Sequence, residues 1–158
     1  MEIELSDVIS YFIGFLSALL VALITLWFQH KLEEKKIKKA LVSELQINAK
    51  ILARMHDYFK KTKSKKFYPI LHTVVYEDLV RRGILYDLPE DLRIELVNVY
   101  NHIKAINSAC LVSIWGLVPI DPDRAISELP QVIDQIINVT QRLIQLWKIK
   151  HWRRELNS

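Results

Sequence analysis

The stretch that decides the fold is VISYFIGFLSALLVALITLWF, residues 8–28. It contains no charged side chain, whereas acids precede it and a basic run follows it. At about 1.5 Å of rise per residue, a helix of this length covers roughly 30 Å, the thickness of the hydrocarbon core of a bilayer. The sequence therefore predicts a transmembrane helix over residues 8–28, preceded by a short extracytoplasmic N-terminus, residues 1–7.

A secretory signal peptide is the competing interpretation of this segment. Signal peptides combine a basic start, a shorter apolar run and a small-residue cleavage site. Here the start is acidic, and the run ends in Trp27 and Phe28 with no small-residue cleavage signature after them. The sequence therefore favours a retained single-pass anchor.

The charges at the two ends of the span predict its orientation. Three acids precede it and five lysines follow it closely. Because the positive flank of a membrane helix stays in the cytoplasm, we expect the N-terminus outside the cell membrane and residues 29–158 in the cytoplasm. The five lysines are also predicted to contact lipid headgroups of the bilayer. They are Lys31, Lys35, Lys36, Lys38 and Lys39.

The remainder of the chain has the composition of a helical domain. Only three glycines occur in the whole sequence, and apolar residues recur at three- and four-residue spacing. We expect helices over about residues 29–61, 69–82, 89–115 and 122–155. The predicted fold is all-α, with one N-terminal transmembrane helix that continues into a cytoplasmic helical bundle of about four helices.

The first cytoplasmic helix carries a heptad-like row of residues, which we call the seam. Its members alternate four- and three-residue steps, and they are Leu41, Leu45, Asn48, Leu52, Met55 and Phe59. Neighbouring isoleucines widen the apolar face, so packing inside a bundle and a two-stranded coiled coil both fit the pattern. Asn48 is the one polar member, with Glu44 one turn earlier. We favour a hydrogen-bonded core amide over a functional site for Asn48.

The segment ALVSELQIN, residues 40–48, contains the pattern leucine, two residues, Glu-Leu, two residues, Asn. This pattern resembles a helix of uncharacterised small prokaryotic single-pass membrane proteins with a helical cytoplasmic domain. The stretches VYEDL (75–79) and LPEDL (88–92) are also similar, and the resemblance covers about residues 8–107. It implies a membrane-anchored helical domain and brings no established activity.

Residue types that serve catalysis or metal binding are present without the spacing that such sites need. The five histidines are far apart, and His72 with Glu77 or Asp78 would need a third ligand from the fold. The three glycines are scattered, so no phosphate-binding loop exists, and Cys110 lies alone in an apolar stretch. The sequence therefore predicts no enzyme, and no catalytic, metal-binding or cofactor-binding residues.

Charge is distributed unevenly along the chain. Residues 31–66 hold twelve Lys and Arg against four acids, whereas residues 67–128 hold five against nine. On a straight helix, the basic cluster at residues 60–66 would lie about 45–50 Å from the membrane, beyond the range of its charge. That cluster is either a solvated loop or a contact for an acidic partner. The chain has no recognised nucleic-acid-binding motif, so nucleic acid is not favoured.

Two further segments are candidates for a second membrane contact. Residues 105–120 are apolar but too short and too polar for a second span, so they are either bundle core or a wedge in the interface. The segment WKIKHWRR, residues 147–154, resembles an interfacial anchor because it alternates tryptophan with cations. The sequence leaves open which of the two lies at the membrane-facing end of the bundle.

Small residues recur every fourth position in the span, and we call them the stripe: Ser10, Gly14, Ala18 and Ala22. Such stripes let membrane helices approach closely, although small residues are also common in membrane helices generally. Together with the seam, the stripe predicts a homo-oligomer. The predicted function is a membrane-tethered interaction or scaffold module that self-associates, with an unidentified cytoplasmic protein as a further partner. The alternative is an oligomeric membrane effector or channel-like protein.

Overall fold

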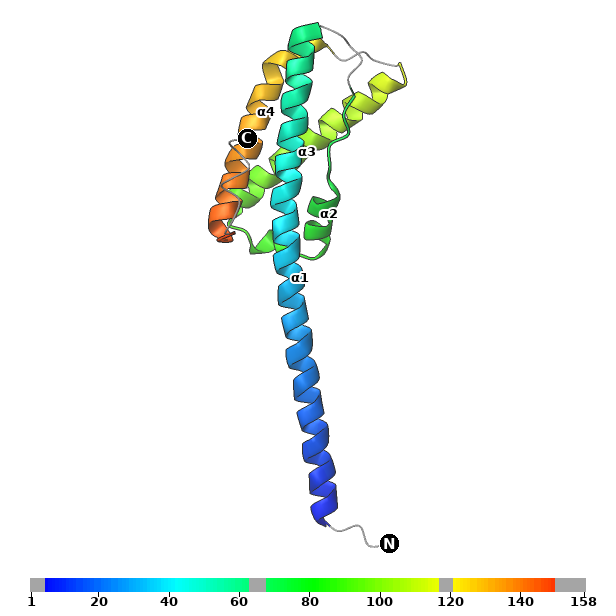
Figure 1. Ribbon diagram of the computed structural model, residues 1–158, viewed down its shortest axis with the longest axis vertical. Coiled ribbons are helices and arrows are strands. Elements are labelled where there is room, and N and C mark those ends of the chain that lie inside the picture. Colours follow the sequence, from blue (N-terminus) through cyan, green and yellow to red (C-terminus); the bar gives the residue numbers. More distant parts are fainter. Residues whose placement is uncertain (1–4, 63–67, 117–120, 150–158) are drawn as a thin grey trace. The chain divides into compact units, whose positions relative to one another are not determined.

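The computed structural model describes residues 5–62, 68–116 and 121–149. All regular structure in these ranges is helical (Figure 1). The elements are α1 (Leu5–Thr62), α2 (Val74–Arg81), the 3-10 helix η1 (Ile84–Asp87), α3 (Glu90–Ile114) and α4 (Pro122–Leu146). The predicted all-α fold with one long apolar N-terminal helix is confirmed.

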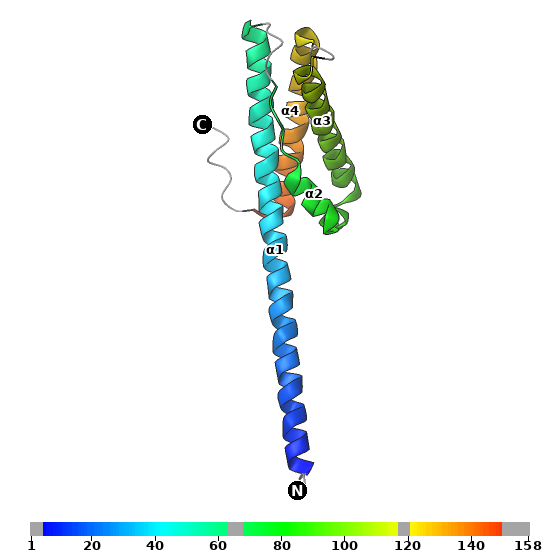
Figure 2. The same ribbon diagram turned by 90° about the vertical axis from the view of Figure 1, so that its right-hand side faces the viewer.

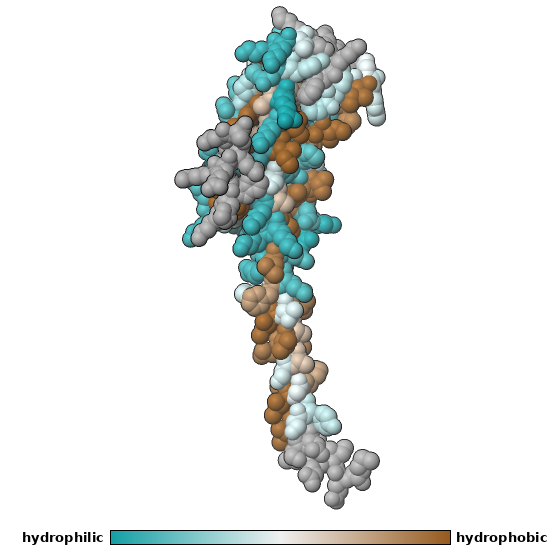
Figure 3. Space-filling model, in the orientation of Figure 1, coloured by the Kyte–Doolittle hydropathy of each residue, from teal (hydrophilic) through white to brown (hydrophobic). Residues whose placement is uncertain are grey.

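The chain divides into two compact units, residues 1–36 and 37–158, and each is described by itself. In the first unit, every side chain from residue 9 to residue 33 is exposed. Figure 3 shows mostly apolar and few strongly hydrophilic side chains along this part of α1. Among the described residues, α1 is the one helix that is long and apolar enough to cross a membrane.

Two hydroxyl groups inside the apolar segment are satisfied by the helix itself. Ser17 donates a hydrogen bond to the carbonyl oxygen of Ile13, and Thr25 donates one to the carbonyl oxygen of Val21, each at 2.8 Å. A polar group without a partner costs several kcal/mol in hydrocarbon. These two bonds therefore make the segment compatible with a lipid environment.

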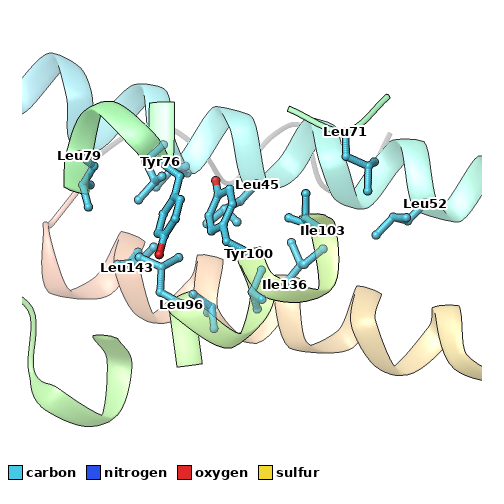
Figure 4. Close-up of a cluster of buried hydrophobic side chains, with 14 of the residues drawn as sticks. Leu45, Leu52, Leu71, Tyr76, Leu79, Leu96, Tyr100, Ile103, Ile136 and Leu143 are labelled. Atoms are coloured by element: carbon cyan, nitrogen blue, oxygen red, sulfur yellow. The ribbon is translucent and has the colours of Figure 1, made fainter. Parts of the chain in front are cut away.

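The second unit is a helical bundle. Figures 1 and 2 show α3 and α4 alongside the part of α1 that follows residue 37. Leucine, isoleucine and tyrosine side chains from α1, α2, α3 and α4 fill the space between the helices (Figure 4). The largest fully buried side chains include Tyr100, Phe59, Leu41, Leu45, Leu52, Leu79, Leu96, Ile103, Ile136 and Leu143. All six seam residues are buried in this core.

The predicted second helix begins later than expected. The sequence predicts a helix over residues 69–82, but residues 68–73 are not helical and α2 begins at Val74. The predicted start is therefore wrong, because side chains of α1 and α3 bind the backbone of this segment, as described below. Gly83, with φ of 74°, follows the C-cap of α2, in the left-handed conformation that glycine adopts readily.

The fourth helix begins as predicted and ends earlier. Asp121 caps it by accepting a hydrogen bond from the Asp123 N–H at 3.1 Å. The helix ends at Leu146, so the prediction that it continues to residue 155 is wrong at Lys148 and Ile149. Residues 150–155, the N-terminal residues 1–4, residues 63–66 of the basic cluster and residues 117–120 lie outside the described residues.

A backbone motif closes α4 at this point. Lys148 has φ of 47° and donates its N–H to the carbonyl oxygen of Gln145, while Ile149 donates its N–H to that of Ile144. This pair of bonds is the Schellman arrangement, which normally uses glycine where Lys148 stands. Ile144 and Ile149 both pack against the core, so the chain is held on the bundle as it leaves the helix.

Candidate functional site

The non-helical segment before α2 is held by two asparagine side chains. The Asn48 amide donates to the carbonyl oxygen of His72 at 2.7 Å and accepts from the His72 N–H at 2.8 Å. Asn107, on α3, does the same with Leu71, at 2.9 and 2.8 Å. Each amide thus pairs with the N–H and C=O of one residue, as an antiparallel β-strand would.

The alternation of an extended chain explains why two different helices take part. The backbone groups of consecutive residues in an extended chain face opposite sides. His72 can therefore face Asn48 on α1 while Leu71 faces Asn107 on α3. Asn48 is fully buried and hydrogen-bonded, as the interpretation of a core amide requires. Its partner is the extended backbone rather than a side chain of a neighbouring helix.

The Glu44 carboxylate lies one turn before Asn48 and binds the start of α2. It accepts hydrogen bonds from the N–H groups of Val75, at 2.8 Å, and Tyr76, at 3.2 Å. The N-cap residue Thr73 makes no capping bond with its own side chain. Since the first N–H groups of a helix have no partner within it, Glu44 caps α2 from another helix and places a negative charge at its positive end.

Tyr100 completes this arrangement, which we call the polar clamp: Glu44, Asn48, Tyr100 and Asn107. Its hydroxyl donates to Oε1 of Glu44 at 2.6 Å. Its ring stacks on that of Tyr76, with centroids 3.9 Å apart and planes 9° from parallel (Figure 4). Burial raises the pKa of both phenols, and the negative charge of Glu44 raises the pKa of Tyr100 further.

These raised pKa values predict that alkaline pH destabilises the bundle. The unfolded phenol titrates near pH 10, so the stabilisation is complete below that pH and falls as pH rises towards the folded pKa. Above pH 10, we expect the free energy of unfolding to fall by up to about 1.4 kcal/mol per pH unit from Tyr100, with a further fall in the same direction from Tyr76. Tyr100→Phe should make this slope shallower, measured by chemical unfolding in detergent micelles from pH 8 to pH 11. Parallel curves for the two proteins would contradict the prediction.

A groove lies between α3 and the first half of α4, with a volume of about 930 Å³. Its apolar side chains include Met55, Ile106, Val112, Leu129 and Val132, and its polar ones include His102, Arg124 and Glu128. Residues of the segment 105–113 line this groove together with Met55; within the segment Cys110 and Ser113 are buried, whereas Leu111, Ile114 and Trp115 are exposed. Burial raises the pKa of the Cys110 thiol, which disfavours the thiolate that a nucleophile needs.

His72 with Glu77 or Asp78, which would need a third ligand to hold a metal ion, gains none within the part of the chain that the structure describes. The described ranges contain no group of three or more His, Cys, Asp or Glu side chains that could hold a metal ion. Asp78 instead pairs with Arg81 at 2.5 Å and Arg82 at 3.1 Å, and the hydrogen bond from Arg81 lowers its pKa. Glu77 accepts a hydrogen bond from Thr73 at 3.3 Å. These carboxylates therefore serve local ion pairs and hydrogen bonds.

The lysines that follow the span lie on the surface or near it. Lys35, Lys36 and Lys39 are exposed, and Lys31 pairs with Glu34 at 3.5 Å. Lys38 places its ammonium 5.6 Å from the centroid of the Trp147 ring, a cation–π contact between α1 and the end of α4. The sequence did not predict this contact of Lys38, because Lys38 and Trp147 are far apart in the chain.

No protein-family model, curated protein or solved structure matches this chain. Over the described residues, the protein is all-α, with one candidate membrane span and a bundle whose second helix is fastened by buried polar side chains.

Proposed function

We propose that the protein is a single-pass protein of the cell membrane whose bundle acts as a tethered interaction or scaffold module. The observation that supports this most is that α1 supplies both the exposed apolar segment, residues 9–28, and the buried seam. No residue outside a helix separates the two. Such a helix is suited to tethering a folded module at a bilayer surface.

The flanking charges support the orientation of this proposal. The acids before the span and the five lysines after it favour a bundle in the cytoplasm, with the lysines near the headgroups. Four of these lysines are exposed and lie within about the first three helical turns after Phe28.

We further propose that the protein self-associates through the stripe. Gly14, Ala18 and Ala22 are exposed, and a Cβ atom added to Gly14 would meet no atom within 4 Å. An exposed face of small residues lets a second helix pack closely, and the gain is van der Waals contact rather than exclusion of water. A second copy of this chain presents the same stripe.

Gly14→Ile is expected to weaken this association. The branched side chain keeps the two helices apart, which should cost about 1–2 kcal/mol, or 5- to 30-fold in the association constant. The control is Leu16→Ile, two residues further and on the opposite side of the helix. Energy transfer between labelled copies in nanodiscs or vesicles would measure both variants. Equal association of both variants and the wild type would rule out the stripe as the interface.

The mass of the solubilised protein tests self-association directly. Light scattering with detergent correction should give a defined multiple of the 18.6 kDa chain. A monomer across the accessible concentrations would overturn self-association. The proposed function would then be a tethered module that acts as a monomer.

The alternative, an oligomeric membrane effector, predicts leakage from liposomes. Besides the aromatic residues, the span has Ser10, Ser17 and Thr25 as polar side chains and no charged residue. The hydroxyls of Ser17 and Thr25 are bonded to their own helix, which gives little polar surface for a water-filled pore. We therefore favour the tethered module, and dye release from reconstituted liposomes distinguishes the two.

A further inference from the structure

We infer that the bundle carries a second surface for self-association, at the C-terminal half of α3, which docks onto the same surface of a second copy of this chain. This inference rests on the proposed self-association and adds to the stripe a contact outside the span. The surface has two parts. One is the groove between α3 and α4, and the other is an apolar tip formed by Leu111, Ile114 and Trp115.

The apolar tip is exposed at the end of α3. Leu111, Ile114 and Trp115 are 51%, 50% and 75% exposed. Their spacing of three and four residues places them on one face of the helix. The Trp115 N–H donates to the carbonyl oxygen of Leu111 at 3.2 Å, and Gly116 then leaves the helix with φ of 72°. Figure 3 shows hydrophobic side chains gathered over this end of α3.

The apolar tip is continuous with the groove. Ser108, which lines the groove, lies in the same row of α3 as Leu111 and Trp115. Beside it, Ala105 and Ala109 give the wall of the groove small side chains, which allow a neighbouring helix to approach closely. Each copy therefore presents a hollow next to a protrusion. A two-fold axis can place the apolar tip of each copy in the groove of the other.

The composition of the surface is that of an interface centre. Residues 105–116 contain no charged side chain. The centres of protein interfaces are depleted of charge and enriched in tryptophan. Sixteen described residues line the groove, and the apolar tip adds three. One side of a specific interface has about 20–30 residues, so the surface is nearly large enough without help from the span.

The charges at the rim of the groove favour a second copy over an anionic partner. Arg124 and Glu128 form an ion pair there at 2.8 Å, with exposed side chains, and Asp121 lies on the same rim. Under a two-fold axis, a rim of mixed sign can place the arginine of one copy beside the glutamate of the other. Two acids against one arginine do not attract anionic headgroups or nucleic acid.

Membrane tethering supplies the geometry that this docking needs. Copies that are each anchored by one span in the same bilayer are parallel, so a two-fold axis relating two of them lies along the membrane normal. Such an axis brings together residues at equal height, and the surface on α3 then faces its own copy. Association through the stripe also raises the effective concentration of the second bundle, so a modest contact area suffices.

Chemical crosslinking of the full chain in lipid vesicles tests the inference. In a Cys110→Ala background, Ser108→Cys places one thiol at the wall of the groove, where docking brings two copies of it close. The control is Ala53→Cys. Ala53 is exposed and lies two residues from the groove-lining Met55, so it faces the other side of α1. A short bis-maleimide joins neighbouring thiols, and energy transfer between copies labelled at the N-terminus measures association as a whole.

Ser108→Cys is expected to crosslink several times more than Ala53→Cys at equal protein density. Adding Trp115→Glu should lower crosslinking at Ser108 about tenfold, because it places a charge in a contact that excludes water. Tyr86→Glu is its control and should leave crosslinking unchanged. It also replaces an aromatic side chain that is more than two-thirds exposed, so neither variant disturbs the core.

Two kinds of failure are distinguishable. If energy transfer persists while Ser108 crosslinks no more than Ala53, or is unaffected by Trp115→Glu, the inference is overturned and the surface belongs to a different partner. Absence of energy transfer in the chain without substitutions would instead overturn self-association itself, and this inference with it.

Discussion

Replacing Glu44 with glutamine is expected to lower the free energy of unfolding by about 3–4 kcal/mol, because hydrogen bonds to a buried charge contribute about 1.5–3 kcal/mol each. The carboxylate accepts from two backbone N–H groups and from the Tyr100 hydroxyl, and Glu44 is only 4% exposed. The glutamine amide is nearly the same size, but its nitrogen is a donor. It therefore faces another donor at one of the two carboxylate positions.

Thermal unfolding in detergent micelles, followed by near-UV circular dichroism, would measure this loss. The tyrosine signal is informative, because Tyr100 stacks on Tyr76 at the N-terminal end of α2, where Glu44 binds the backbone. Glu128→Gln is the matched control, since that carboxylate is 59% exposed in its pair with Arg124 and should change stability by less than about 1 kcal/mol. If the Glu44 and Glu128 variants melted alike, Glu44 would not fasten α2.

The sequence predicted the parts of this fold that depend on local periodicity. The seam repeats at helical spacing, and all six of its residues are buried. The span is a single charge-free run, and the structure leaves its side chains uncovered by other helices. In both cases the signal is contained in neighbouring residues of one helix, so no knowledge of distant partners was needed.

The segment before α2 could not be predicted in this way. Its backbone partners, Asn48 and Asn107, lie 24 and 36 residues away, and Glu44 lies 31 residues from Val75. The sequence signal was the presence of polar residues in an apolar face, which predicted a bonded core amide at Asn48 but not its partner. The end of α4 was missed for another reason. Lys148 occupies a left-handed position where glycine would have marked the stop.

Replacing Asn48 with leucine should lower the free energy of unfolding by about 2–4 kcal/mol, because each buried backbone group left without a partner costs about 1–3 kcal/mol. The His72 N–H and carbonyl groups both lose their partner in this variant. Asn48→Asp should be at least as harmful at neutral pH, because it places a carboxylate oxygen against the His72 carbonyl. Asn101→Leu, at an exposed position of α3, is the control and should change stability by less than about 0.5 kcal/mol.

The two asparagines bind adjacent residues of one segment, so their effects should not add. Once Asn48→Leu has freed one side of the segment, Asn107→Leu should cost less than it does in the wild type, with a coupling of about 0.5–3 kcal/mol. Hydrogen exchange at the Leu71 and His72 amides gives an independent measurement, since both N–H groups are bonded to asparagine oxygens. Each single variant should accelerate exchange at both amides. Additive stabilities, or exchange that accelerates only at the amide whose partner was removed, would show that the two side chains act independently.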